Sequence, residues 1–225
     1  MSAPLDESLL LSPTEARIVG CLIEKAATTP ESYPLTVNSL MLAANQKTSR
    51  EPVMSLEEGE IGHALRELED RGWVRVVHGS RAHRYEHRIE DKLSVTRPQR
   101  ALLCLLMLRG PQSAPELLTR CERLADVGSL DDVKQVLERL QQRGFVANVG
   151  RASGQREDRY AHLFCGAVEV HARRDEEEVA SSPGGASLAQ RVADLEALTA
   201  SLMARIDALE QGAARGTTES ASLAP

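Results

Sequence analysis

The sequence contains few aromatic residues and few cysteines. Its 225 residues include one Trp, three Tyr and two Phe, which argues against the stacked aromatic platforms that bind single-stranded nucleic acid. The four cysteines, Cys21, Cys104, Cys121 and Cys165, form no C-x-x-C pair. This spacing favours reduced thiols in a cytoplasmic protein over a disulfide framework or a zinc site.

Signals for export, membrane insertion and catalysis are also missing. The first ten residues, MSAPLDESLL, are acidic and unlike a signal peptide, and no apolar run is as long as a membrane span. No phosphate loop, nucleotide fingerprint, nucleophile elbow or paired-carboxylate signature occurs. We therefore expect a cytoplasmic protein that does not associate with membranes. We also expect that it is not an enzyme and that it binds no cofactor and no metal.

The charge of the chain is moderate and unevenly distributed. The net charge is −6, with 42% apolar and 27% charged residues, so the chain can bury a core. Residues 1–95 and 171–225 are acidic, whereas residues 96–170 are slightly basic. Any nucleic-acid binding must therefore depend on local basic patches.

Helix starts are recognisable because capping boxes recur, in which a hydroxyl caps the helix and the third residue reaches back. The chain shows this pattern at Ser12…Glu15, Ser55…Glu58, Thr96…Gln99, Ser113…Glu116 and Ser187…Gln190. Together with apolar periodicity, these signals predict helices at 13–28, 36–44, 56–71, 97–109, 114–124, 130–143 and 188–211.

An internal repeat indicates the architecture. An amphipathic helix that leads into the segment RGWV at 71–74 has a counterpart 72 residues later, which leads into RGFV at 143–146. A second strand follows each copy, RYEH at 84–87 and RYAH at 159–162. Three helices followed by a hairpin, occurring twice, predict a mainly α protein with small β-hairpins (α+β), built from two tandem winged-helix domains and a C-terminal amphipathic, coiled-coil helix.

Composition sets the domain boundaries that we expect. The segment after the second repeat is rich in acidic residues, Ser and Gly, as linkers are. The expected parts are an N-terminal tail at 1–11, winged-helix domains at 12–95 and 96–170, a flexible linker at 171–186, a heptad helix at 187–211 and a disordered tail at 212–225.

The heptad segment predicts a parallel homodimer. Leucines recur every seven residues, with β-branched residues dominating the other core position, a pattern that favours two strands. The candidate interface residues are Leu188, Val192, Leu195, Thr199, Leu202, Ile206 and Leu209. The alternative is an amphipathic helix that folds back on its own domain.

Basic residues on the two hairpins are the candidate DNA contacts, because arginines on a protruding hairpin can follow phosphates. They are Arg81, Arg84, Arg88, Arg151, Arg156 and Arg159. The alternative is that these arginines serve solubility or pair with neighbours, as Arg84 would with Glu86.

The loop before the third helix is a further candidate, because it is polar and positively charged. Its residues Asn45, Gln46, Lys47, Ser49 and Arg50 belong to the segment NQKTSREPV at 45–53. They could anchor phosphate, with Lys47 and Arg50 as the contacts, or bind a protein carboxylate. They could equally lock the turn between two helices through Asn and Ser hydrogen bonds.

The third helix of each domain is a weaker candidate for the major groove. In the first domain its outer face carries Glu60, Glu67 and Asp70, which repel phosphate. The corresponding face in the second domain is close to neutral.

Several longer motifs resemble the YceH-like proteins of bacteria. They are LSPTEAR at 11–17, GCLIEK at 20–25, TP at 29–30, YPL at 33–35, NQKTSREPV at 45–53, GSR at 79–81, RYEHR at 84–88 and RYAHL at 159–163. The resemblance runs from about residue 11 to residue 166. It implies a tandem winged-helix fold and the formation of a dimer. It implies no particular activity.

The function that we expect is binding of double-stranded DNA in transcriptional regulation, through the arginine-bearing hairpins. The alternative is a scaffold that grips a protein partner, as in the chromosome-condensation subunit ScpB, whose acidic tandem winged-helix architecture is similar. Arg81→Ala and Arg156→Ala would abolish activity in the first case. Reversing the charges of the acidic third helix would do so in the second.

The heptads generate a prediction about the oligomeric state. A chain that ends after Gly166 lacks the whole apolar seam, so it is expected to keep two folded domains and to change from a dimer to a monomer. Sedimentation velocity of the full and shortened chains measures this. A shortened chain that stays dimeric would place the interface in the winged domains.

Overall fold

A computed structural model of the protein describes residues 5–79, 82–151, 157–166, 199 and 203. The chain divides into two units, Met1–Arg173 and Arg174–Pro225. The predicted linker at 171–186, the tail at 212–225 and all the heptad interface residues except Thr199 lie outside the described residues. Thr199 is helical and exposed.

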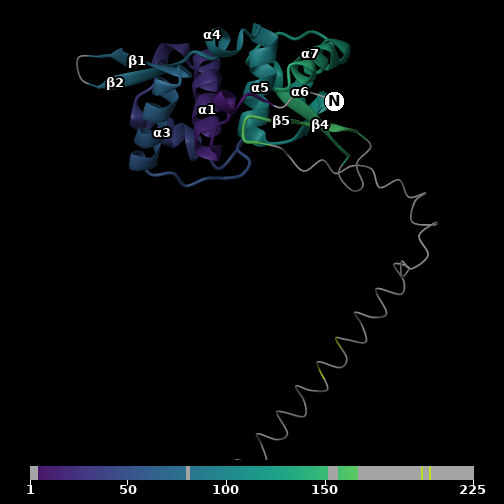
Figure 1. Ribbon diagram of the computed structural model, residues 1–225, viewed down its shortest axis with the longest axis horizontal. Helices are drawn as coiled ribbons and strands as arrows, with labels where there is room; N and C mark the ends of the chain where they lie inside the picture. The colour runs from purple at the N-terminus through teal and green to yellow at the C-terminus, as the bar shows by residue number, and fades with distance from the viewer. Residues whose placement is uncertain (1–4, 80–81, 152–156, 167–198, 200–202, 204–225) are drawn as a thin grey trace, which may run out of the picture. The chain divides into compact units, whose positions relative to one another are not determined.

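The first half of the larger unit consists of three helices and a hairpin (Figure 1). The helices are α1 (Pro13–Thr28), α2 (Val37–Ala44) and α3 (Glu58–Asp70), and the antiparallel strands are β1 (Val74–His78) and β2 (His83–His87). Short 3-10 turns occur at Glu7–Leu9 and Pro30–Ser32.

The second half repeats this order after a short helix, α4 (Ile89–Leu93). Its elements are α5 (Arg97–Arg109), β3 (Gln112–Ser113), α6 (Ala114–Cys121), α7 (Leu130–Gln142), β4 (Val146–Gly150) and β5 (Arg159–His162). The strands form an antiparallel sheet in the order β3-β5-β4. The predicted fold class, mainly helical with small antiparallel strand pairs, is confirmed.

The capping signals placed the helix starts well, with one exception. The boxes that begin at Ser12, Thr96 and Ser113 are present, and the box predicted at Ser187 lies outside the described residues. The box predicted at Ser55 is wrong, because Glu57 caps α3 and pairs with Glu60 instead. Two neighbouring pairs fit the same spacing rule, so the sequence alone did not distinguish them.

The two halves share one core, which is centred on the contact between α1 and α5. The helices approach closely because Gly20 has no side chain. A Cβ there would lie 2.8 Å from Leu108 Cδ2 and 3.3 Å from Met107 Cβ. The thiol of Cys104 donates a hydrogen bond to the Gly20 carbonyl at 3.3 Å, which is possible only at this short separation.

Phe164 makes a second connection between the halves. Its ring packs edge-to-face on Trp73, with centroids 5.6 Å apart, and lies 5.5 Å from the ring of Phe145. Trp73 and Phe145 are the equivalent aromatic residues of the repeat. The backbone carbonyl of Phe164 also accepts a hydrogen bond from Leu11 N at 2.7 Å, so the N-terminal segment is fixed against the same cluster.

The two hairpins project from different ends of the larger unit (Figure 1). Val74 of β1 and Val146 of β4 are buried in the shared core, so both hairpins are anchored to it. Within the part of the chain that the structure describes, no helix is long and apolar enough to cross a membrane.

The close packing at Gly20 generates a stability prediction. Gly20→Val forces a branched side chain against Leu108 and Met107, so it is expected to lower the free energy of unfolding by about 1–3 kcal/mol. Urea denaturation measures the change. Gly59→Ala is the matched control, because nothing lies within 4 Å of a Cβ at that position. The control is expected to be neutral or to stabilise by about 0.4–1 kcal/mol. Equal stability of wild type and Gly20→Val would contradict this packing.

Candidate functional site

The loop between α2 and α3, residues 45–56, turns its polar groups toward the protein. The side-chain amide of Asn45 donates to Leu56 O at 2.8 Å, and its oxygen accepts from Leu56 N at 2.8 Å. Asn45 therefore joins the two ends of the loop. For this residue, the turn-locking interpretation is the one that the geometry supports.

Arg50 is buried and does not face DNA, which corrects its prediction as a phosphate contact. Its guanidinium donates to both carboxylate oxygens of Glu24, at 3.1 and 2.6 Å, and its Nε donates to Ala43 O at 3.0 Å. Burial opposes ionisation of Glu24, but the hydrogen bonds from Arg50 still hold the pKa of that carboxyl below its usual value. The physical reason for the correction is that the N–H donors of Arg50 are directed at acceptors in the interior. They are therefore not available to a phosphate.

Arg17 is a second buried arginine, and sequence reasoning missed it. Its side chain is 1% exposed and donates to Ala44 O at 3.1 Å and to Pro52 O at 2.6 Å. Burial lowers the pKa of its guanidinium. The available signal was its position in α1, because the apolar run around it, from Ala16 to Ile23, is buried on every side.

The same loop is also bound to the second half. The backbone of Glu51 donates to Leu108 O at 2.8 Å, and Arg109 Nη2 donates to Ser49 Oγ at 2.5 Å. Ser49 adopts a positive φ of 63°, which turns the chain so that both contacts form. We call Arg17, Glu24, Arg50 and the loop 45–56 the clasp, because together they connect α1, α2 and α5 to the segment that leads into α3.

The described hairpin arginines already have partners within the protein. Arg84 donates to Pro34 O at 2.7 Å, and Glu86 pairs with Arg75 instead of Arg84. Arg88 bonds Asp91 at 2.6 Å, Arg151 bonds Asp158 at 3.0 Å, and Arg159 bonds Pro111 O and lies 3.4 Å from Glu116. The predicted contacts Arg81 and Arg156 lie outside the described residues.

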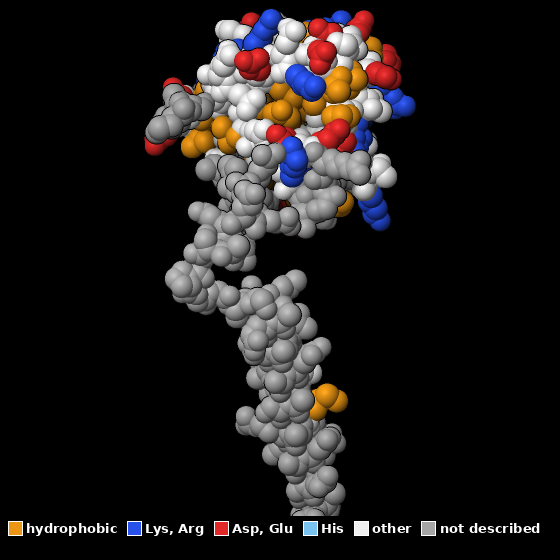
Figure 2. Space-filling view, turned by 90° about the vertical axis from the view of Figure 1, so that its right-hand side faces the viewer, with side chains coloured by type: hydrophobic (Ala, Val, Ile, Leu, Met, Phe, Trp, Pro, Cys, Tyr) orange, Lys and Arg blue, Asp and Glu red, His pale blue; other side chains and the backbone are white. Residues whose placement is uncertain are grey.

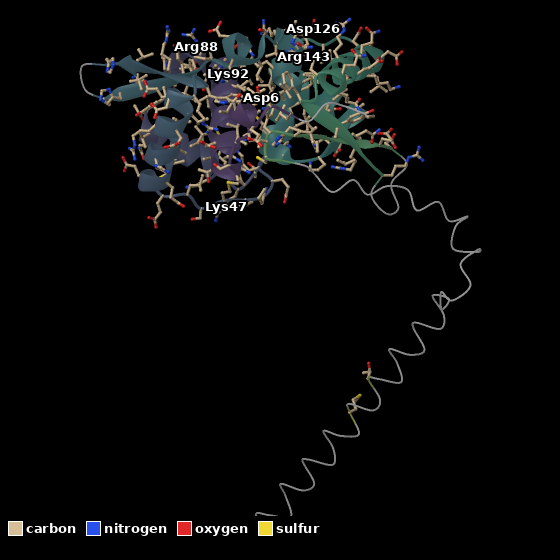
Figure 3. All side chains as sticks on the ribbon, in the orientation of Figure 1. Asp6, Lys47, Arg88, Lys92, Asp126 and Arg143 are labelled. Atoms are coloured by element: carbon tan, nitrogen blue, oxygen red, sulfur yellow. The ribbon has the colours of Figure 1, made fainter. Side chains whose placement is uncertain are left out.

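Lys47 is the predicted contact that remains most accessible. It is exposed and, within the described ranges, forms no ion pair, whereas its neighbour Gln46 is half-buried. Figure 3 shows Lys47 at the opposite edge of the unit from Arg88. The candidate DNA contacts therefore do not gather on one surface.

The exposed face of α3 is strongly acidic. It carries six carboxylates, of Glu57, Glu58, Glu60, Glu67, Glu69 and Asp70, against one guanidinium, that of Arg66. The corresponding face of α7 is more balanced, with Asp131, Asp132 and Glu138 against Lys134 and Arg139. Of these two helices, α3 therefore has the more strongly charged exposed face.

Two large apolar side chains are exposed beside the start of α3. Leu42 on α2 is 64% exposed and Val53 in the loop is 57% exposed. Large exposed apolar residues in one region are typical of protein interfaces.

A cavity of about 510 Å³ lies between the end of α3, β1 and α4, and Arg75, Arg88 and Lys92 line it. Arg75 is paired with Glu86 and Arg88 with Asp91. Arg71 also lines the cavity and is paired with Glu15, so Lys92 is the one lining cation that forms no ion pair with another described residue. Among the described residues, no cluster of three or more His, Cys, Asp or Glu side chains is arranged to hold a metal ion.

Comparison with known proteins identifies relatives along nearly the whole chain. Residues 11–155 match a family described as "Protein of unknown function, DUF480". The UPF0502 protein Smlt0097 of Stenotrophomonas maltophilia is 53% identical over 203 residues, which cover 88% of this chain and 93% of that protein. The UPF0502 protein xcc-b100_4348 of Xanthomonas campestris is 50% identical over 206 residues, covering 89% and 93% respectively.

The clasp generates a prediction that separates its structural role from DNA binding. Arg50→Ala leaves Glu24 and Ala43 O without their donor, so it is expected to lower the free energy of unfolding by about 2–3 kcal/mol. This is below the roughly 3–5 kcal/mol of a fully buried pair, because Glu24 keeps some contact with solvent.

Lys47→Ala, in the same loop, is the control and is expected to change the stability by less than about 0.5 kcal/mol. Urea denaturation monitored by Trp73 fluorescence measures both variants. If the two variants proved equally stable, the clasp would not be holding the loop.

Proposed function

This chain belongs to the protein family described as "Protein of unknown function, DUF480", and we propose that it is a protein-interaction module that binds a basic partner through the exposed face of α3. The family assignment agrees with the YceH-like resemblance of its motifs. The proposal departs from the expectation of DNA binding, and the acidity of α3 is the observation that carries it.

The charge of α3 opposes entry into a DNA groove. A recognition helix lies in the major groove between two phosphate strands. Each carboxylate held about 6 Å from a phosphate costs about 0.7 kcal/mol even at the dielectric constant of water. Six carboxylates and one arginine on this face therefore repel the ligand that the helix would have to approach.

The same face is suited to a segment rich in Lys or Arg. Opposite charges across an interface speed encounter and select partners. The adjoining Leu42 and Val53 side chains supply exposed apolar area beside α3, and apolar cores with polar rims are typical of protein interfaces. Glu58, Glu67 and Asp70 form no ion pair within the described part of the chain, so their carboxylates are open to a partner.

DNA binding in transcriptional regulation is the second candidate. The exposed Lys47 and the solvent-facing arginines Arg84 and Arg151 favour it. It ranks second because both arginines are engaged within the protein, and displacing those partners reduces the gain from phosphate contact. A homodimer formed by the heptads would present two copies of either surface.

Charge reversal on α3 tests the proposal. Glu60→Lys, Glu67→Lys and Asp70→Lys together are expected to lose at least tenfold in the yield of the partner that the wild-type protein retains from an extract of its own cells. The captured proteins are identified by mass spectrometry.

The matched control combines Glu7→Lys, Glu31→Lys and Glu138→Lys, which are exposed on other elements and change the net charge equally. It is expected to retain the same partner. Equal loss with both triple variants would show a response to total charge and would count against a binding site on α3.

A further inference from the structure

The second half carries a groove that is separate from the acidic face of α3. A cavity of about 380 Å³ lies between α6 and the loop that leads into α7. Its apolar lining comes from Leu118, Cys121, Ala125 and Val127, and its rim carries Glu122 and Asp126. Leu118 and Cys121 are three residues apart on α6 and share one face of it, and Ala125 follows in the loop after the helix ends.

A smaller cavity of about 260 Å³ continues along the same face of α6. Pro115, Leu130 and Tyr160 line it, and they belong to α6, α7 and β5. Pro115 and Leu118 are three residues apart on α6, so the two cavities adjoin. Figure 2 views the end of the unit that carries α6 and α7 and shows apolar side chains gathered among charged ones.

The rim of the larger cavity is acidic and available. Glu122 and Asp126 are exposed, and within the described residues neither forms an ion pair. Asp126 Oδ1 accepts a hydrogen bond from Gly128 N at 3.1 Å, which fixes the loop and leaves the second oxygen open. Apolar walls beneath two carboxylates are complementary to an apolar side chain that has a basic neighbour.

From this geometry we propose that the groove between α6 and the α6–α7 loop binds a short partner segment, in which one or two Leu, Ile or Phe side chains are flanked by Lys or Arg. The inference rests on the proposed protein-binding function and adds a second contact, separate from α3. The apolar side chains fill the cavity, and the basic residues pair with Glu122 and Asp126.

DNA is a poor occupant of this groove. Phosphates would meet the carboxylates of Glu122 and Asp126 at one end, with apolar side chains beside them. At the other end, Arg151 lines the smaller cavity but is already paired with Asp158 at 3.0 Å. Lys134, beside the smaller cavity, is already paired with Asp131 at 3.5 Å. The surface therefore offers a phosphate backbone few donors and several repulsive charges.

The test uses the full chain and a displayed library of random 12-residue peptides. Peptides that enrich on the wild-type protein are expected to share one or two large apolar residues next to Lys or Arg. Their affinities, measured by fluorescence anisotropy, are expected to fall at least tenfold with Leu118→Asp plus Val127→Asp. They are expected to change less than twofold with Leu10→Asp plus Ala82→Asp, which adds the same charge at two exposed positions outside both α3 and the groove.

The double variant Glu122→Gln plus Asp126→Asn tests the groove without disturbing the fold. Both residues are exposed, and the side-chain oxygen of Asn can still accept the hydrogen bond from Gly128 N. This pair is expected to weaken the peptides about fivefold and to reduce the dependence on salt. Enriched peptides that are acidic, or that do not respond to either groove pair, would overturn the inference. A lack of any enriched peptide would overturn it as well.

The outcomes also separate the groove from the proposed function. Peptides that respond only to reversal of Glu60, Glu67 and Asp70 would place all binding on α3, which overturns the groove and leaves the function standing. Self-association abolished by Leu118→Asp would identify a second copy as the occupant and overturn the proposed partner. Displacement of the peptides by duplex DNA would count against the function itself.

Discussion

The ion pair of Arg50 with Glu24, reinforced by Arg17, is the constraint on which the rest of the structure depends. These two buried guanidiniums donate to carbonyl oxygens of α2 and of the loop 45–56. Arg17 belongs to α1, and Glu24 anchors Arg50 to the same helix. Because the loop also bonds α5 through Ser49 and Glu51, the clasp fixes α3 and joins the two halves at once. Arg50 is thereby held inside the protein and is not available to nucleic acid, whereas Lys47 in the same loop stays exposed.

Much of the fold was predictable because its determinants are local. Capping pairs, apolar periodicity and the Arg-Gly-aromatic repeat placed six helices and both hairpins within a few residues. The short helix α4 was missed because five residues carry too little periodic signal. The clasp was missed for another reason. The partners of Arg17 and the carboxylate that pairs with Arg50 lie 26 to 35 residues away in sequence, and charge alone marks an arginine as exposed.

The candidate site shows the same limit. The sequence identified the acidic outer face of α3 correctly, because helical spacing decides which side chains share a face. It did not show that Arg84, Arg88, Arg151 and Arg159 have acceptors within the protein, since those acceptors depend on how loops meet the hairpins. What remains exposed is acidic on α3, and apolar with an acidic rim beside α6. Both surfaces favour a partner that is basic and partly apolar.

The central claim is that this protein recognises a protein partner and not DNA. Fluorescence anisotropy of labelled duplex fragments from its own genome, titrated with the full chain at about 50 and 200 mM salt, tests it most directly. The account predicts at most weak, non-specific association at the lower salt, with a dissociation constant no tighter than about 10⁻⁶ M. Nanomolar binding that collapses steeply between the two salt concentrations would contradict it. That result requires many phosphate contacts, whereas the exposed side of α3 is acidic and the described hairpin arginines are engaged within the protein.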